Sequence, residues 1–119
     1  RHPLVDALNH PSGRLIGRRQ GYEVDMEEVV RVAAAHGKAL EINAQPDRLD
    51  LDDIWSRRAK DAGVPLVIGT DAHELGHMGF MRYGVFVARR GWVERKNVLN
   101  AQPLRGLLAW LQHRKTRVA

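Results

Sequence analysis

Cysteine is absent from the chain, which excludes a disulfide framework and any metal site built on thiolates, and which weakly favours a cytoplasmic protein. No run of about 18 apolar residues is present, so the sequence predicts no membrane-spanning helix and no membrane partner. The first three residues, Arg1, His2 and Pro3, include neither an initiator methionine nor the start of an apolar signal segment. We therefore expect the chain to begin within a larger protein.

Acidic residues are scarce in the last third of the chain. Residues 82–119 contain nine lysines and arginines but a single acid, Glu94, whereas residues 1–81 contain ten basic and thirteen acidic residues. The net charge of +5 therefore comes from a basic C-terminal segment that ends in the run from His113 to Arg117. Such a segment could follow the phosphate backbone of DNA, or it could be an ordinary solvated helix face and tail.

The length of 119 residues, with 44% hydrophobic and 28% charged residues, suits a single domain spanning residues 1–119. Three apolar runs have the length of strands: residues 4–9, 39–42 and 64–69. Between these runs, Asp25 and Asp50 stand where helix N-caps are expected, and Gly37 and Gly63 stand where those helices would end. Two successive strand–helix–strand units predict an α/β fold with parallel strands and crossover helices.

The second half of the chain is predicted to be mainly helical. Residues 78–90 place apolar side chains on one side of a helix, which Gly91 and Trp92 end. A helical turn is expected at residues 96–100, and Pro103 suits the first position of a final helix. The apolar stripe of that helix is expected to pack against the body of the domain; it consists of Leu104, Leu107, Leu108 and Leu111.

Polar side chains follow each predicted strand. His10 comes after the first strand, Asn43 after the second, and Asp71 and His73 after the third. Because the carboxyl ends of parallel strands share one edge of a sheet, we expect these four residues to meet there. Imidazole nitrogen and carboxylate oxygen together suit a divalent transition metal. Two structural interpretations stay open: Asp71 could form an Asx turn, and His10, before a proline, could be a turn residue.

Four stretches of the sequence resemble one protein family. They are NHPSGRLIGRRQGYEVD (9–25), ALEINAQPDRLDL (39–51), VIGTDAH (67–73) and MRYGVFVARRGWVERKNVLN (81–100). They resemble the polymerase-and-histidinol-phosphatase (PHP) domain at the C-terminus of bacterial family X DNA polymerases. The resemblance covers essentially the whole chain, but only about the last half of that domain. It implies a partial PHP domain, namely the C-terminal half of a distorted (βα)7 barrel.

The resemblance also implies a chemistry. In this family the strand ends hold divalent metal ions, for which we expect Mn²⁺, Zn²⁺ or Mg²⁺, and His10, Asp71 and His73 match ligands. The implied activity is phosphoester hydrolysis in DNA repair, as a 3′ to 5′ exonuclease or 3′ phosphatase, with metal-bound water attacking phosphorus. The family's opening His-x-His motif and its bridging glutamate belong to the first half of the domain and have no counterpart here. The chain alone is therefore expected to be inactive, or nearly so.

Several other polar residues are assigned by this comparison. Four histidines match no ligand position and are expected at the surface or in turns: His2, His36, His77 and His113. Glu41 alternates with apolar neighbours in a strand, so we expect it to support the site from behind or to be the buried partner of an arginine. Asn43 could orient the substrate or a metal ligand.

Arginines on the loop after the first strand are candidates for binding phosphate. Arg14 has forked donors that suit a non-bridging phosphate oxygen, and Arg18 or Arg19 could contact the next phosphate along a strand of DNA. The structural alternative for Arg14 is a salt bridge to an acid such as Asp6 or Glu23.

Two further functions remain open. The chain could be a non-catalytic DNA-binding or scaffolding module of the polymerase, with its basic segment on DNA. In that case Trp92, Trp110 and Tyr83 could stack on bases, although aromatics at such spacing are more often core residues. A phosphatase of small metabolites is the third possibility. In every case half a barrel exposes a sheet edge, so we expect association with the rest of the barrel and the polymerase core, or with a second copy.

Overall fold

The computed structural model describes residues 2–116, with side chains up to residue 113. Three parallel strands form one sheet in the order β1-β2-β3: β1 (Ala7–Leu8), β2 (Ala39–Asn43) and β3 (Leu66–Gly69). The α-helices are α1 (Met26–Ala35), α2 (Asp53–Asp61), α3 (Met81–Arg90) and α4 (Leu104–Thr116). Three 3₁₀ helices complete the fold: η1 (Leu75–Phe80), η2 (Arg95–Asn97) and η3 (Leu99–Ala101). The predicted α/β architecture with parallel strands and crossover helices is confirmed.

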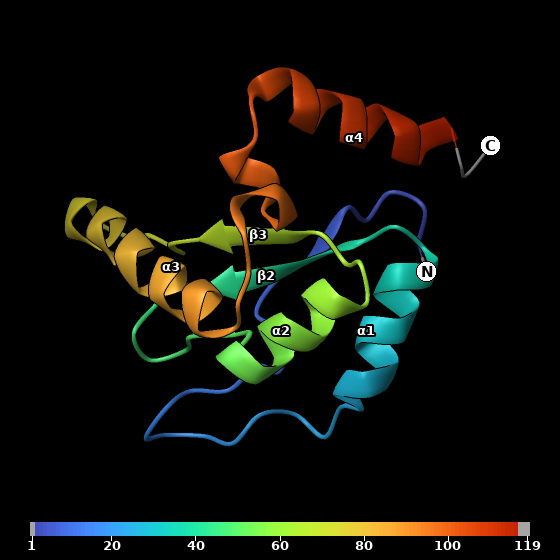
Figure 1. Cartoon of the computed structure of the whole chain (residues 1–119). Coiled ribbons are helices and arrows are strands. Elements are labelled where there is room, and N and C mark those ends of the chain that lie inside the picture. Colours follow the sequence, from blue (N-terminus) through green and yellow to red (C-terminus); the bar gives the residue numbers. More distant parts are fainter. Residues whose placement is uncertain (1, 117–119) are drawn as a thin grey trace.

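Helices cover both faces of the sheet. Helices α1 and α2 lie on one face, and α4 lies on the opposite face (Figure 1). The central strand β2 is buried along its whole length, because it has a strand on each side and helices above and below. The apolar core lies mainly between the sheet and α1, α2 and α3; its largest members include Met26, Val30, Leu40, Ile42, Leu51, Leu66, Ile68 and Val87. This core fixes the strands and leaves their carboxyl ends to polar residues.

The N-cap of α1 is the one that the sequence predicts, whereas the N-cap of α2 is not. The Asp25 side chain accepts a hydrogen bond from the Glu28 amide, a contact that stabilises a helix by about 1 kcal/mol. In α2 the same function belongs to Asp52, which accepts from the Trp55 amide at 2.8 Å. The prediction of Asp50 as the cap is therefore wrong. Its carboxylate is buried and points to another part of the chain.

Strand β1 is much shorter than the predicted strand over residues 4–9. Only Ala7 and Leu8 pair with β2, opposite Ala39 and Leu40. Leu4 is 79% exposed and lies outside the sheet. Within the described residues, β1 has a partner on one side only, so nothing extends its ladder.

The approach of α3 to the sheet depends on a glycine. A Cβ atom at Gly84 would lie 2.5 Å from Cγ2 of Ile68 and 3.0 Å from Cβ of Ala44, so a larger residue would push the helix away. The predicted helix over 78–90 is confirmed from Met81 onward, but the preceding residues form the 3₁₀ helix η1. Gly91 and Trp92 follow the helix as predicted, with Trp92 at a φ of 57°.

The outer edge of β3 is covered by the segment after α3. The Asn100 side chain acts like a neighbouring strand, because it donates to the Ile68 carbonyl at 2.8 Å and accepts from the Ile68 amide at 3.1 Å. Val98 also forms an isolated parallel bridge with Leu66. The segment after α3 thus acts as a strand-like partner of β3 and protects this edge from pairing with another chain.

The final helix α4 is formed, but its leucine stripe is only partly covered. Leu104 and Leu108 are 70% and 48% exposed, whereas Leu107 and Leu111 are half-buried. The prediction that the whole stripe packs on the domain is therefore wrong for two of its four members. Of the predicted basic tail, the side chains from Arg114 to Arg117 lie outside the described residues. Within the described part of the chain, none of the helices has the length and apolar character needed to cross a membrane.

Candidate functional site

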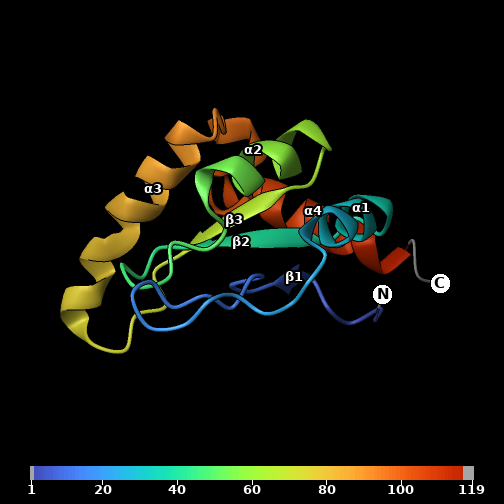
Figure 2. The ribbon, with the colours of Figure 1, turned by 90° about the horizontal axis from the view of Figure 1, so that it is seen from below.

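The loops that follow β1, β2 and β3 gather at one end of the sheet (Figure 2). The loop after β2, residues 44–50, lies between the other two and bonds to both. It returns beside its own strand, because Asn43 and Asp50 form an isolated antiparallel bridge and the Leu51 amide donates to the Glu41 carbonyl at 2.9 Å. The predicted site residues are therefore carried by three loops that a single central loop holds together.

Two buried acids hold the turn that carries His10. The His10 amide donates to Oε2 of Glu41 at 2.7 Å. The amides of Ser12 and Gly13 donate to the Asp50 carboxylate at 3.1 Å and 2.9 Å, and Asp50 is only 1% exposed. Consecutive amides that point into one concavity form a typical anion site. Here the anions are the protein's own carboxylates, which fix the turn against the central loop.

Glu41 is a buried carboxylate at the centre of the site. Burial raises its pKa above the ordinary value; the hydrogen bonds from the His10 amide and the Asn43 side chain and the charge of His10 oppose this rise, and the charge of Asp71 adds to it. Its Oε1 lies 2.5 Å from where a Cβ at position 69 would stand, so a side chain there would force the Glu41 carboxylate to move. The prediction that Glu41 supports the site from behind agrees with these contacts, and the predicted arginine partner is not found among the described residues.

The Asp71 carboxylate is oriented by the central loop. Its Oδ2 accepts from Nδ2 of Asn43 at 3.2 Å and lies 3.8 Å from Nε of Arg48. The Asp71 carbonyl accepts from Nε2 of Gln45 at 2.7 Å. Asn43 is buried and donates to Glu41 as well, at 3.4 Å. Asn43 thus joins the acid beneath His10 to the acid after β3.

His73 is exposed and is held through its neighbours. Its Nδ1 lies 2.7 Å from the Asp71 carbonyl, and its amide donates to Nδ1 of His77 at 3.3 Å. His77 also lies 3.3 Å from both the Gln45 amide group and the Glu74 carboxylate, and its ring stacks on Phe80 at 4.8 Å. The sequence predicts His77 to be a surface or turn residue; it lies half-buried in the 3₁₀ helix η1 and contacts the loop that carries His73.

Arg14 points to the central loop and not to the acids proposed as alternatives. Its Nε donates to the Arg48 carbonyl at 2.7 Å, its Nη2 donates to the Leu49 carbonyl, and its Nη1 lies 4.0 Å from Asp52. The side chain is half-buried, so part of it still reaches solvent beside the site. Whether it also contacts a substrate stays a prediction.

Backbone strain is concentrated at the same place. Four of the described non-glycine residues adopt a positive φ, and three of them belong to the site: His10 at 30°, Leu49 at 43° and Asp71 at 51°. Such conformations cost on the order of 1 kcal/mol or more each, and they persist where surrounding contacts enforce them. Two of the three predicted metal ligands, His10 and Asp71, thus have a strained backbone, which is consistent with a functional arrangement of these loops.

The described residues do not by themselves complete a metal site. The His10 turn and the Asp71 carboxylate both border the Glu41–Asn43 pair, and exposed His73 follows in the same loop as Asp71. Convergence of the His10, Asp71 and His73 side chains on one metal ion stays a prediction. However, within the described part of the chain no group of three or more His, Asp and Glu side chains is close enough to hold a metal ion. Any metal centre here needs ligands from elsewhere.

Sequence reasoning missed Asp50, Arg48 and Gln45. All three lie in QPDRLDLDD (45–53), a stretch dense in charge that the helix pattern explains only from Asp52 onward. That unexplained charge was the available signal. The proposed stacking residues differ in exposure: Trp92 is 69% exposed, whereas Tyr83 and Trp110 are half-buried. Their role with DNA stays a prediction.

Comparison with known proteins agrees with the sequence resemblance. The chain is 49% identical over 108 residues to the DNA polymerase/3'-5' exonuclease PolX of Bacillus subtilis, which is 91% of this chain and 19% of that protein. It is 32% identical over 116 residues to a probable phosphatase of Edwardsiella ictaluri and 27% identical over 106 residues to one of Thermoanaerobacter sp.. The chain spans 44% and 41% of those two proteins. No family model matches the chain. The resemblance to a bacterial family X DNA polymerase is therefore confirmed over 91% of this chain.

Proposed function

We propose that this chain is part of a metal-dependent phosphoesterase domain of the 3′ to 5′ exonuclease or phosphatase type. The domain would be attached to a family X DNA polymerase that acts in DNA repair in the cytoplasm. The observation that carries the proposal is the polar cluster of His10, Glu41, Asn43 and Asp71 at the strand ends. It lies within a segment 49% identical to the DNA polymerase/3'-5' exonuclease PolX of Bacillus subtilis.

The proposed metal ligands of this chain are His10, Asp71 and His73, and the proposed ions are Mn²⁺, Zn²⁺ or Mg²⁺. The described residues supply too few ligands for a closed site. The remaining ligands would come from the rest of the barrel, and the isolated chain would be inactive. The proposed function thus belongs to the intact domain, in contact with the polymerase core.

The proposed substrate is DNA, single-stranded or gapped, bound by its phosphate backbone. Asn43 would act by holding the Asp71 carboxylate in a fixed orientation, since it donates to both Asp71 and Glu41. Arg14 would add positive charge beside the phosphate, while its Nε and Nη2 hold the central loop. Strained backbone at His10 and Asp71 would be the cost of presenting both residues to the same substrate.

A phosphatase of small phosphate esters is the second candidate. Two relatives of 27% and 32% identity carry the name probable phosphatase, and the chain covers a larger share of them than of PolX. The basic C-terminal segment favours DNA, because a small ester would not need it.

The intact polymerase tests the proposal. Release of nucleotides from 5′-labelled single-stranded DNA is measured with added Mn²⁺ and with chelator, next to hydrolysis of p-nitrophenyl phosphate. Mn²⁺-dependent release of 3′ nucleotides is the expected result. Hydrolysis of the small ester alone would favour the phosphatase. The non-catalytic module would instead bind DNA without hydrolysing it. Its affinity for DNA would fall steeply with added salt and would not change with chelator.

A further inference from the structure

Arg48 brings a positive charge to the candidate site. Its Nε lies 3.8 Å from Oδ2 of Asp71, a distance that makes an ion pair but not a hydrogen bond. The Arg48 side chain is 21% exposed and the Asp71 side chain 33% exposed, so both are partly shielded and both still reach solvent. Among the described residues, the Arg48 guanidinium donates no hydrogen bond. Its fork of donors is therefore available beside the acid.

The backbone around Arg48 is unusually well fixed. The amides of Arg48 and Leu49 both donate to the Gln45 carbonyl, at 2.9 Å and 3.0 Å. Arg14 donates from Nε to the Arg48 carbonyl and from Nη2 to the Leu49 carbonyl, so one side chain clamps two consecutive peptide groups. Leu49 takes a positive φ within this clamp. A loop held in this way can place an arginine at a defined point of the site.

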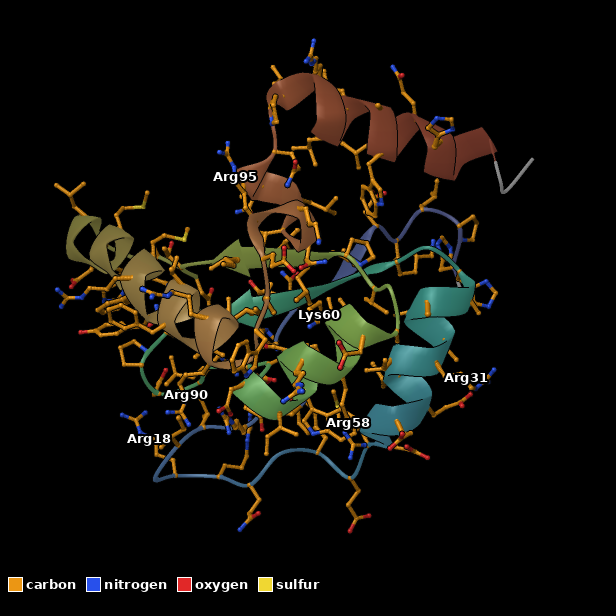
Figure 3. The ribbon with its side chains drawn as sticks, in the orientation of Figure 1. Arg18, Arg31, Arg58, Lys60, Arg90 and Arg95 are labelled. Carbon is orange, nitrogen blue, oxygen red and sulfur yellow. The ribbon has the colours of Figure 1, made fainter. Side chains whose placement is uncertain are left out.

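Three other arginines pair with acids at helix surfaces. Arg31 and Arg58, labelled in Figure 3, project from α1 and α2 and bond to Glu28 and Glu27 at 2.6 Å and 2.7 Å. Arg90 bonds to Asp53 at 2.9 Å. Each of these has an acidic partner at hydrogen-bond distance. Arg48 differs, because the acid that it faces, Asp71, belongs to the site and lies beyond hydrogen-bond distance.

We propose that Arg48 binds the phosphate group of the substrate directly, as a specificity-determining residue of the proposed hydrolase site, and that Arg14 positions it. The inference rests on the proposed function. A guanidinium presents two parallel N–H groups to two phosphate oxygens, and it stays charged at every physiological pH. When no substrate is bound, the ion pair with Asp71 offsets the positive charge of the Arg48 guanidinium. A phosphate that arrives next to Asp71 then meets donors already aimed at it.

The test uses the intact polymerase and compares Arg48→Ala, Arg48→Lys and the surface control Arg31→Ala. Loss of a charge-assisted contact should lower kcat/KM for single-stranded DNA by about 10- to 100-fold in Arg48→Ala. Arg48→Lys keeps the charge but not the fork, so we expect an intermediate loss. Added guanidinium ion should restore part of the activity of Arg48→Ala, because it can occupy the vacated site. Arg31→Ala should match the wild type.

Each outcome decides one of the two proposals. A wild-type polymerase without Mn²⁺-dependent hydrolysis would remove the proposed function, and this inference with it. An active wild type whose Arg48→Ala variant has unchanged kcat/KM would overturn the role of Arg48 alone. Loss of activity in Arg48→Ala with no rescue by guanidinium and with a lowered melting temperature would assign Arg48 a structural role, against the inference. If Arg48→Ala does not fold, full activity of a folded Arg48→Lys would also contradict it.

Discussion

The Glu41 carboxylate accepts a hydrogen bond from the His10 amide at 2.7 Å, although 31 positions separate the two residues in the sequence. This contact joins the turn after β1 to the interior of β2. It also places a buried acid beneath a residue that we propose as a metal ligand. Buried acids such as Glu41 and Asp50 position the loops of the site by accepting hydrogen bonds from their amides.

Replacement of Glu41 by glutamine should change how stability depends on pH. Burial raises the pKa of the Glu41 carboxyl in the folded state above its ordinary value. The stabilising contribution of Glu41 to the free energy of unfolding is therefore present at acidic pH and is lost as the pH rises through the raised pKa. Glu41→Gln keeps an acceptor for the His10 amide and cannot ionise. In urea unfolding, the variant should gain stability relative to the wild type between pH 4 and pH 7.

The outcome against this prediction is also definite. If the difference in unfolding free energy between Glu41→Gln and the wild type were the same at pH 4 and pH 7, ionisation of Glu41 would carry no cost in the folded state. That result would contradict a raised pKa for the Glu41 carboxyl.

Replacement of Asp50 by alanine should destabilise the protein by about 1–3 kcal/mol, because the amides of Ser12 and Gly13 would lose their buried acceptor. Asp61→Ala is the matched control, since Asp61 is exposed and its ion pairs among the described residues are with the helix neighbours Arg57 and Lys60. Chemical unfolding at pH 7 measures both. Equal stability of the two variants would contradict the assigned role of Asp50 in holding the turn.

Replacement of Asp52 by alanine should cost about 1 kcal/mol through loss of the α2 cap and should leave the His10 turn in place. Circular dichroism reports the helix, and amide exchange at Ser12 and Gly13 reports the turn. Asp50→Ala should give the opposite pattern, with fast exchange at the turn. Faster exchange of the turn amides in Asp52→Ala would show that the two aspartates are not separate in function.

Replacement of Gly69 by alanine should displace the Glu41 carboxylate, because the new Cβ would lie 2.5 Å from Oε1. Overpacking of this kind costs about 1–3 kcal/mol. Gly79→Ala provides the control, since nothing lies within 4 Å of its added Cβ. Thermal unfolding separates the two variants. A Gly69→Ala protein as stable as Gly79→Ala would mean that the Glu41 side chain is free to move.

The sequence predicts the architecture of this protein better than its site. Strand–helix–strand repeats and the Asp25 cap depend on residues three or four positions apart, which a local pattern contains. Asp50 and Asp52 look alike in the sequence, and only the partners of Asp50, 37 and 38 positions away, distinguish them. Local patterns cannot supply such partners.

The same reason explains the other differences. The place of Arg14 after His10 predicts a phosphate ligand, but its Nε and Nη2 donate to carbonyls of a loop 34 and 35 positions later. Periodicity identifies the leucine stripe of α4, yet it does not reveal that Leu104 and Leu108 lack a covering surface within the described residues. Properties set by distant segments need the fold.

Nucleotide release by the Asp71→Asn variant of the intact polymerase is the most direct test of the proposed hydrolase site. With Mn²⁺ and 5′-labelled single-stranded DNA, the wild type should release nucleotides and the variant should lose at least about 100-fold in kcat, the order expected when one group of a preorganised site is removed. Equal rates in both proteins would place the chemistry elsewhere and contradict the account of these three loops.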